Sequence, residues 1–210
     1  MSFMTNALST RMRSRVALAA LLAVLGLAAP APGEERRWDA SAELVLARLG
    51  SVDETAAGAG LRLSYRLADL LAIDAGAVLA PGDLGEPAFS ASLRELSLGL
   101  RVGPRPDPTG FYAALRGGTL RYAPAPQPLA CIAIFPPPLA CVLAGGHSAT
   151  ALQLGAGVER LVGSAGLLRL EVGDRLVRLP GPSFDAEGEV RDDDFWSHEL
   201  RVAVSLGLRF

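Results

Sequence analysis

The chain has 210 residues, of which 50% are hydrophobic, 20% are charged and only 6% are aromatic. Its 20 basic residues are all arginine and stand against 22 acidic residues, so the formal net charge is -2. This near balance argues against the basic surface that nucleic-acid binding requires, and the apolar content lies above the range of disordered chains. The length suits one domain, or at most two small ones.

The first 33 residues have the three parts of a secretory signal peptide. Three arginines between positions 11 and 15 form a basic region, residues 16–29 are an apolar run, and small residues and prolines follow at 30–33. The run of 14 residues is shorter than the roughly 20 that a membrane-spanning helix needs. We therefore expect cleavage, which leaves residues 34–210 with 17 arginines, 22 acidic residues and no lysine.

The rest of the chain alternates apolar and polar residues with a period of two, which is typical of strands with one apolar and one polar face. The clearest case is the C-terminus, where mostly apolar residues occupy every second position from 196 to 210. Eight segments show the pattern, and most approach the length of about 9–11 residues of a tilted membrane strand. In chain order they are 42–49, 60–67, 71–80, 95–102, 111–122, 152–159, 167–179 and 196–210.

The connections between these segments alternate in length. The short ones are 68–70, 103–110 and 163–166, the longer ones are 81–90, 123–147 and 180–195, and 51–55 is ambiguous. Short turns at one end and long loops at the other are typical of bacterial outer-membrane barrels. The sequence therefore predicts an all-β fold over residues 34–210, an eight-stranded antiparallel up-and-down transmembrane barrel.

The polar face of these strands combines glycine with arginine and acidic residues in near balance. A membrane barrel turns such residues into its lumen and its apolar residues to lipid, whereas a soluble barrel does the reverse. Residues 34–210 contain no lysine and no asparagine, and aromatic residues stand at the strand ends. Both observations favour the membrane arrangement. The predicted lumen charges are Glu43, Arg62, Arg66, Asp74, Glu95, Arg101, Arg116, Glu159, Arg169, Glu171, Arg175, Glu199, Arg201 and Arg209.

Short turns set the register of some of these charges. The third short turn places Glu159 directly opposite Arg169, and the first places Asp74 diagonal to Arg62 and Arg66, within reach of long side chains. Eight strands leave an interior just wide enough for side chains. Because unpaired charges are costly in so narrow a space, we expect these charges to pair and to plug the lumen.

Two segments, 152–160 and 205–210, resemble the OmpA/OmpX-type family of small eight-stranded outer-membrane barrels. The second is similar to the C-terminal signal that the outer-membrane assembly machinery reads, with Phe210 as its terminal residue. The resemblance covers the mature chain, without a periplasmic domain after the last strand. It implies an exported monomer in the outer membrane of a Gram-negative bacterium, in contact with outer-membrane lipid, lipopolysaccharide and the assembly machinery.

The two cysteines end two copies of a Pro-Leu-Ala-Cys motif in the apolar connection at 123–147. Export would take Cys131 and Cys141 out of the reducing cytosol, so we predict a disulfide between them. The connection itself could contact a partner or lipid, or it could fold over the barrel mouth, and the sequence leaves these possibilities open.

Candidate catalytic and metal-binding residues are few. His147, Ser148 and Glu159 are residue types that lipid A deacylases use on an eight-stranded barrel, but alternation points Ser148 to the opposite face from the other two, so no triad is expected. Neither histidine has partners at metal-ligand spacing, and the acidic connection at 180–195 does not match a calcium-binding loop. No metal or other cofactor is expected.

Taken together, these patterns predict a non-enzymatic outer-membrane barrel with a plugged polar lumen, acting in envelope structure or in surface contacts through its loops. Two alternatives stay open: a lipid A-modifying enzyme on the same fold, and a soluble periplasmic barrel that binds a hydrophobic ligand. Membrane fractionation distinguishes the soluble barrel, and mass spectrometry of lipid A distinguishes the enzyme.

Overall fold

The computed structural model describes residues 36–50, 54–80, 92–122, 139, 146–184 and 188–210. The predicted signal peptide and both cysteines lie outside these residues. The chain divides into two units, one of Met1–Arg36 with Phe210 and one of Arg37–Arg209, and the second holds all the strands. Within the described residues no helix has the length and apolar character needed to cross a membrane.

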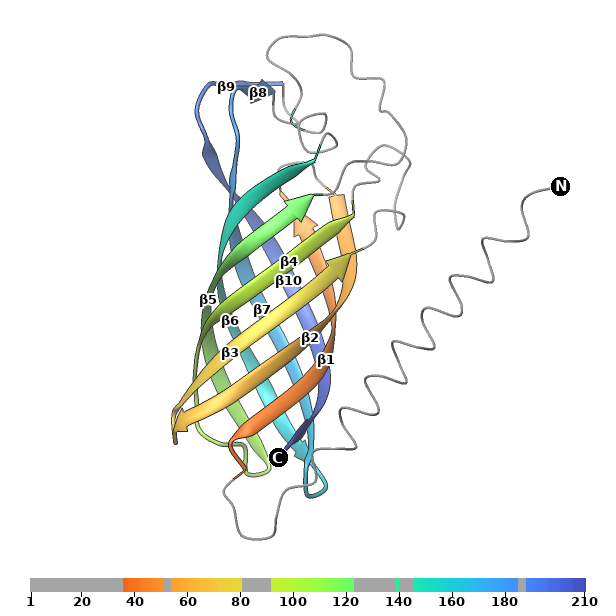
Figure 1. Cartoon of the computed structure of the whole chain (residues 1–210), viewed down its shortest axis with the longest axis vertical. Helices are drawn as coiled ribbons and strands as arrows, with labels where there is room; N and C mark the ends of the chain where they lie inside the picture. Colours follow the sequence, from red (N-terminus) through yellow and green to blue (C-terminus); the bar gives the residue numbers. More distant parts are fainter. Residues whose placement is uncertain (1–35, 51–53, 81–91, 123–138, 140–145, 185–187) are drawn as a thin grey trace, which may run out of the picture. The chain divides into compact units, whose positions relative to one another are not determined.

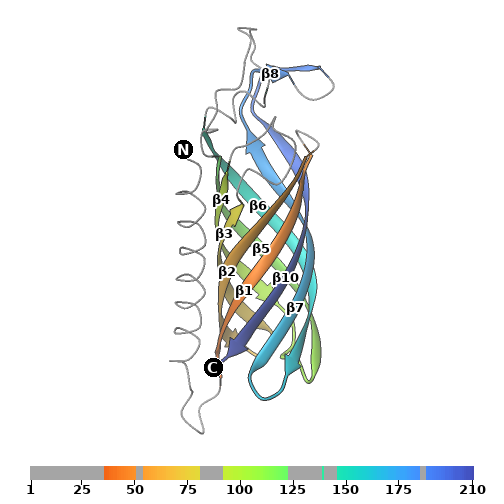
Figure 2. The ribbon, with the colours of Figure 1, turned by 90° about the vertical axis from the view of Figure 1, so that its right-hand side faces the viewer.

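The second unit contains a closed barrel of eight antiparallel strands, in which each strand pairs with its sequence neighbours and the last closes on the first (Figures 1 and 2). The barrel strands are β1 (Trp38–Leu49), β2 (Glu54–Ala68), β3 (Leu71–Ala80), β4 (Leu93–Val102), β5 (Thr109–Tyr122), β6 (His147–Val162), β7 (Gly166–Leu179) and β10 (Phe195–Arg209). The predicted eight-stranded up-and-down barrel is confirmed. A two-stranded hairpin that the sequence did not predict, β8 (Ser183–Phe184) with β9 (Val190–Arg191), precedes β10.

Two strands, β2 and β6, begin well before the predicted segments. β2 begins at Glu54 instead of residue 60, and β6 begins at His147 instead of residue 152. In both extensions alanine, glycine and small polar residues interrupt the apolar alternation. The strands continue there because backbone groups, not side chains, form the hydrogen bonds of the ladder.

The strands are staggered around the barrel. Following directly paired residues once around the ring from Trp38 leads back to β1 at Arg48, ten positions further along the strand. Closure with such a stagger requires the strands to tilt, by about 35–45° in typical barrels, and the tilt is visible in Figure 1. Consequently, residues from strands that are not neighbours reach the same level of the lumen.

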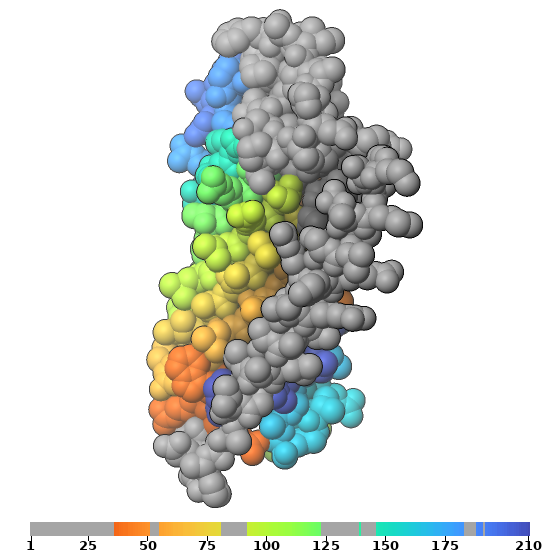
Figure 3. All heavy atoms as spheres, turned by 45° about the vertical axis from the view of Figure 1, so that its right-hand side comes forward, coloured from red at the N-terminus to blue at the C-terminus, as the bar shows by residue number. Residues whose placement is uncertain are grey.

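The barrel has a charged inner face and an apolar outer face. In β10, Glu199 and Arg201 are 0% and 2% exposed, whereas the intervening Leu200 is 55% exposed and Leu206 is 66% exposed. Large exposed apolar side chains occur on the outer face of all eight barrel strands. With all atoms drawn, the visible strands from yellow to green form a continuous wall (Figure 3).

Aromatic side chains occupy the outer face near the short turns. Trp38 and Tyr65 are directly paired across β1 and β2, and their ring centroids lie 4.6 Å apart. Phe111, near the start of β5, is 74% exposed. Aromatic residues at this position are typical of the girdle that flanks the apolar band of an outer-membrane barrel.

Candidate functional site

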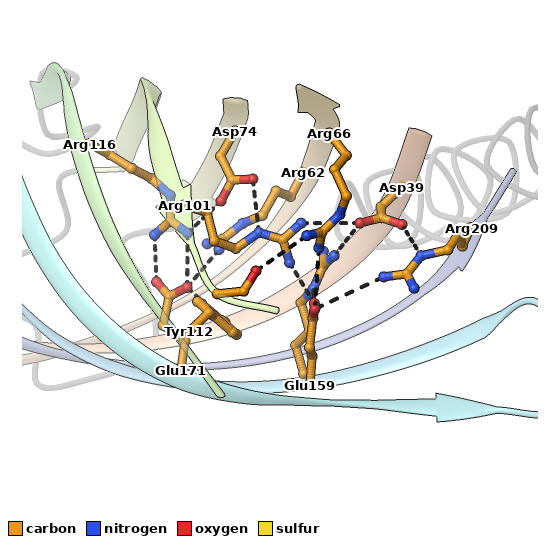
Figure 4. A network of polar contacts seen from close by, with 12 residues as sticks. Asp39, Arg62, Arg66, Asp74, Arg101, Tyr112, Arg116, Glu159, Glu171 and Arg209 are labelled. Carbon is orange, nitrogen blue, oxygen red and sulfur yellow. Dashed lines mark hydrogen bonds and ion pairs between the residues drawn. The ribbon is translucent and has the colours of Figure 1, made fainter. Parts of the chain in front are cut away.

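The candidate site is the charged lumen. All fourteen residues that the sequence assigned to it are buried, with exposed fractions of 8% or less, and every barrel strand contributes at least one of them. With Asp39, the buried charged residues of the described chain are eight arginines and seven carboxylates. Their contacts form three clusters along the barrel, and Figure 4 shows much of the first two.

The first cluster lies near the short turns. Glu159 is paired directly with Arg169 in the β6–β7 ladder, the register that the turn predicts, and Arg169 Nε donates to Glu159 Oε2 at 2.9 Å. Arg101 of β4 donates to the same carboxylate oxygen. Arg209 of β10 is also at this end, with Nη2 4.0 Å from Glu159 Oε1. One carboxylate therefore joins arginines from β4, β7 and β10.

Asp39 is the member of this cluster that the sequence analysis missed. It is 4% exposed, and its carboxylate accepts hydrogen bonds from Arg101, Arg169 and Arg209 at 3.1, 2.7 and 2.8 Å. The signal was present, since Asp39 shares the alternation of Glu43. The predicted strand began only at residue 42 and so left Asp39 outside.

Arg66 ties this cluster to two of the short turns. Its Nη1 donates to the backbone carbonyls of Asp69 and Gly103, at 2.7 and 3.2 Å. Its Nη2 lies 3.7 Å from Glu159 Oε1. The guanidinium thus joins Glu159 to the backbone of two short turns.

The second cluster occupies the middle of the lumen and is centred on Glu171 of β7 (Figure 4). Its carboxylate accepts hydrogen bonds from Arg116 and from Arg62 Nη1, the latter at 2.8 Å. The Tyr112 hydroxyl and Gln153 Nε2 also donate to it, at 3.0 and 3.1 Å. Because Arg62 lies on β2 and Arg116 on β5, neither of which neighbours β7, these ion pairs cross the lumen.

Asp74 of β3 connects the first two clusters, and here the structure corrects the expected partners. The register does place Asp74 diagonal to Arg62 and Arg66. Its carboxylate instead accepts a hydrogen bond from Arg116 at 2.9 Å and lies 3.5 Å from Arg101 Nε. An arginine side chain is long enough to extend into so narrow a lumen, so proximity along the wall does not determine the partner.

Glu43 links β1, β2 and β10 in the second cluster. Its Oε2 accepts from Arg62 Nη2 at 2.7 Å and its Oε1 from Arg201 Nη2 at 3.2 Å. Arg201 Nη1 also donates to Gln153 at 3.0 Å. Gln153 and Tyr112 have the same inward alternation as the charges, but being uncharged they were not among the predicted lumen residues.

The third cluster lies towards the long connections. Arg175 of β7 donates from Nη1 to Glu95 at 2.6 Å and from Nε to Glu199 at 2.8 Å. Each of the fifteen buried charges therefore has an ion-pair partner within 4.0 Å. Pairing of this kind is the condition under which charges tolerate burial.

Beyond the third cluster the lumen becomes apolar. Leu139, a described residue of the predicted connection at 123–147, is buried here at 2% exposure. Its position shows that this connection places at least one side chain among the strand ends. The apolar cluster comprises Leu49, Ala80, Leu93, Leu120, Tyr122, Leu139, Ala149, Ala151, Val177 and Leu179.

The residues considered for catalysis are not brought together. His147 begins β6, and Glu159 follows twelve positions later on the same strand, about 40 Å away at about 3.3 Å per residue. Ser148 is exposed on the outer face. His198 is also exposed there, with Nδ1 2.7 Å from Asp174 Oδ2.

The remaining predicted site residues lie outside the described barrel. Cys131 and Cys141 fall outside the described residues, and Phe210 belongs to the other unit. Among the described residues, no group of three or more histidine, cysteine, aspartate or glutamate side chains could hold a metal ion.

No family model and no curated protein matches the sequence. The structure is similar to that of Neisserial surface protein A, with 14% identity over 82% of this chain and 96% of that chain and a TM-score of 0.49. It is also similar to Ail of Yersinia pestis, with 12% identity, coverage of 83% and 97%, and a TM-score of 0.46. For the outer membrane protein OprG of Pseudomonas aeruginosa the identity is 14%, the coverage 85% and 98%, and the TM-score 0.43.

Proposed function

We propose that this protein is an integral outer-membrane barrel of a Gram-negative bacterium, without enzymatic activity, whose lumen is plugged by its own side chains. The observation that carries the proposal is the distribution of polarity, with charges buried inside the barrel and leucine and valine side chains exposed around it. An apolar surface of this extent is unfavourable in water. It matches the lipid-facing band of an outer-membrane barrel.

The same distribution argues against the soluble alternative. A soluble ligand-binding barrel needs an apolar cavity for its ligand and a polar exterior. Here the middle of the lumen is occupied by Glu171 and its arginine partners Arg62 and Arg116. The enzyme alternative lacks support as well, because His147 and Glu159 lie near opposite ends of one strand.

The filled lumen directs the proposed role to the outside of the barrel. Three charged clusters and an apolar cluster follow one another along the lumen, and eight strands leave little space besides. Other molecules then have access to the outer face and the connections alone. We therefore propose a role in envelope structure or surface contacts, as a monomer among outer-membrane lipid and lipopolysaccharide.

The protein, purified from outer membranes, is expected to migrate differently on a gel before and after heating, and to carry no steady large current in a planar lipid bilayer. The first result reports a barrel that resists detergent until heated, and the second reports a filled lumen. A sustained porin-like conductance would contradict the plugged lumen. Absence of the heat-dependent shift would contradict the membrane barrel itself.

We propose that residues 1–33 direct export and that Phe210 takes part in recognition by the outer-membrane assembly machinery. Deletion of Phe210 is expected to lower the amount of heat-modifiable protein in the outer membrane several-fold, whereas Phe210→Tyr, which keeps a terminal aromatic ring, is expected to lower it less. Unchanged outer-membrane levels of the deletion variant would refute the role of Phe210. N-terminal sequencing of the exported protein is expected to begin at Glu34.

The disulfide between Cys131 and Cys141 also stays a proposal. The bond would close a loop of about ten residues and restrict the unfolded chain, which corresponds to about 2.5–3 kcal/mol in the chain-entropy model. Thiol labelling of denatured, unreduced protein is expected to find no free cysteine, and labelling after reduction is expected to find two. Two reactive thiols before reduction would exclude the bond.

A further inference from the structure

Charged residues occur on the outer face of the barrel towards the long connections, and on one side of the barrel they are paired within the chain. Arg178 of β7 lies 3.1 Å from Asp194, just before β10. Asp174 of β7 lies 2.7 Å from His198 of β10. On this side the protein supplies its own counter-charges.

On the side of β4 and β5, the corresponding charges have no partner among the described residues. Arg94 and Arg121 are exposed, and neither has an ion pair or hydrogen bond within the described chain. They are directly opposite each other in the β4–β5 ladder. Like charges in this position repel each other, so the arrangement favours an anion that both guanidinium groups can share.

The side chains next to these arginines are hydrogen-bond donors as well. Ser148 of β6 is directly opposite Arg121, and Thr119 is directly opposite Thr150, two positions along the same face. All are exposed, and the described outer faces of β4, β5 and β6 carry no acidic residue. We name the set Arg94, Thr119, Arg121, Ser148 and Thr150 the donor patch.

The apolar surface next to the donor patch has one position without a side chain, Gly117. Gly117 is exposed on the outer face of β5, with Leu98 and Leu152 as its partners on β4 and β6. These leucines are 61% and 42% exposed. A Cβ atom at Gly117 would meet no atom within 4 Å, so the space between the two leucines is open to a lipid chain.

We propose that the donor patch binds the phosphate of a glycolipid in the outer leaflet, with one acyl chain lying over Gly117. A phosphate monoester carries nearly two negative charges and three acceptor oxygens, and guanidinium groups bind such oxygens in pairs. The donor patch adjoins the apolar band at the end of the long connections, which is the outer side in barrels of this kind. The inference rests on the proposed function, because it requires a barrel that spans the membrane in this orientation.

The test is a titration of the detergent-solubilised full-length protein with diphosphorylated lipid A, followed by native mass spectrometry. The wild type is expected to retain one lipid A molecule. Arg94→Gln and Arg121→Gln are each expected to weaken binding about tenfold, as the loss of a hydrogen bond to a charged group does. Arg160→Gln, which removes an exposed arginine at the opposite end of β6, is the matched control and is expected to bind like the wild type.

Two further arms separate a lipid site from a site for free phosphate. Gly117→Leu fills the gap and is expected to weaken lipid A binding while leaving the donor patch intact. Lipid A without phosphates is expected to bind the wild type weakly. Its affinity for the Arg94→Gln variant is expected to be the same as for the wild type. Displacement of lipid A by millimolar inorganic phosphate, with Gly117→Leu binding normally, would overturn the glycolipid assignment.

The heat-dependent gel shift distinguishes failure of this site from failure of the barrel. A variant that keeps the shift and loses lipid A supports the site. Wild-type protein that shows the shift but binds no lipid A overturns the site and leaves the proposed barrel standing. The site is also overturned if Arg94→Gln and Arg121→Gln bind lipid A as tightly as Arg160→Gln.

Discussion

Glu171→Ala is expected to destabilise the barrel by about 3–5 kcal/mol, the cost typical of breaking a buried ion pair. Arg62 and Arg116 would lose the carboxylate that they share, and Tyr112 and Gln153 would lose an acceptor. The guanidinium groups would remain buried near the middle of the lumen. Urea unfolding of the protein in lipid vesicles, followed by tryptophan fluorescence, measures the change in the free energy of unfolding.

The control is Asp194→Ala, which removes the acidic partner of an exposed ion pair. The side chains of Arg178 and Asp194 are 57% and 48% exposed, and such pairs contribute about 0–1 kcal/mol. Combining Glu171→Ala with Arg116→Met measures the coupling between these two positions. If Glu171→Ala costs no more than Asp194→Ala, the lumen network does not stabilise the barrel.

Leu44→Arg is expected to cost about 2–4 kcal/mol in lipid, because it places a charge on the apolar outer face away from both strand ends. Leu44 is the seventh of the twelve residues of β1 and is 68% exposed. On a surface in contact with water, a substitution at so exposed a position would change stability by about 0.5 kcal/mol or less. The same urea unfolding in vesicles measures the difference.

Leu70→Arg is the matched control, with the same change of side chain in the short turn between β2 and β3. Leu70 is 58% exposed but lies beyond the ends of the strands, where a charge costs about 0–1 kcal/mol. A large difference between the two variants supports a lipid-facing barrel. Equal effects would indicate that the outer face meets water, as in the soluble alternative.

Local sequence patterns were sufficient for the strands and for the contacts next to short turns. The period of two predicted all eight barrel strands, since side chains on successive strand residues point to opposite faces. It also assigned Glu199 and Arg201 to the inner face and Leu200 to the outer face. The short β6–β7 turn was enough to pair Glu159 with Arg169, because a short turn leaves the register little freedom.

The alternation of apolar and polar residues did not predict the parts of strands in which it is interrupted. Small residues concealed the first half of β2, and the late start assigned to β1 concealed Asp39, which binds three arginines. The apolar cluster around Leu139 was also missed. Its members on the strands occupy inward-facing positions. The sequence does not indicate, however, whether an inward-facing apolar residue contacts a charged residue or another apolar residue.

The sequence by itself determined which residues face the lumen, because facing depends only on alternation within each strand. Only the tertiary structure decided which charges meet. Glu171 binds Arg62 and Arg116 from strands that are not neighbours of β7. Asp74 accepts a hydrogen bond from Arg116 and not from the two arginines diagonal to it on β2. Those pairs depend on the ten-residue stagger, which brings residues of distant strands to the same level of the lumen. They also depend on the width of the closed ring, which an arginine side chain can cross. Closure is a property of all eight strands together, so no local segment encodes it.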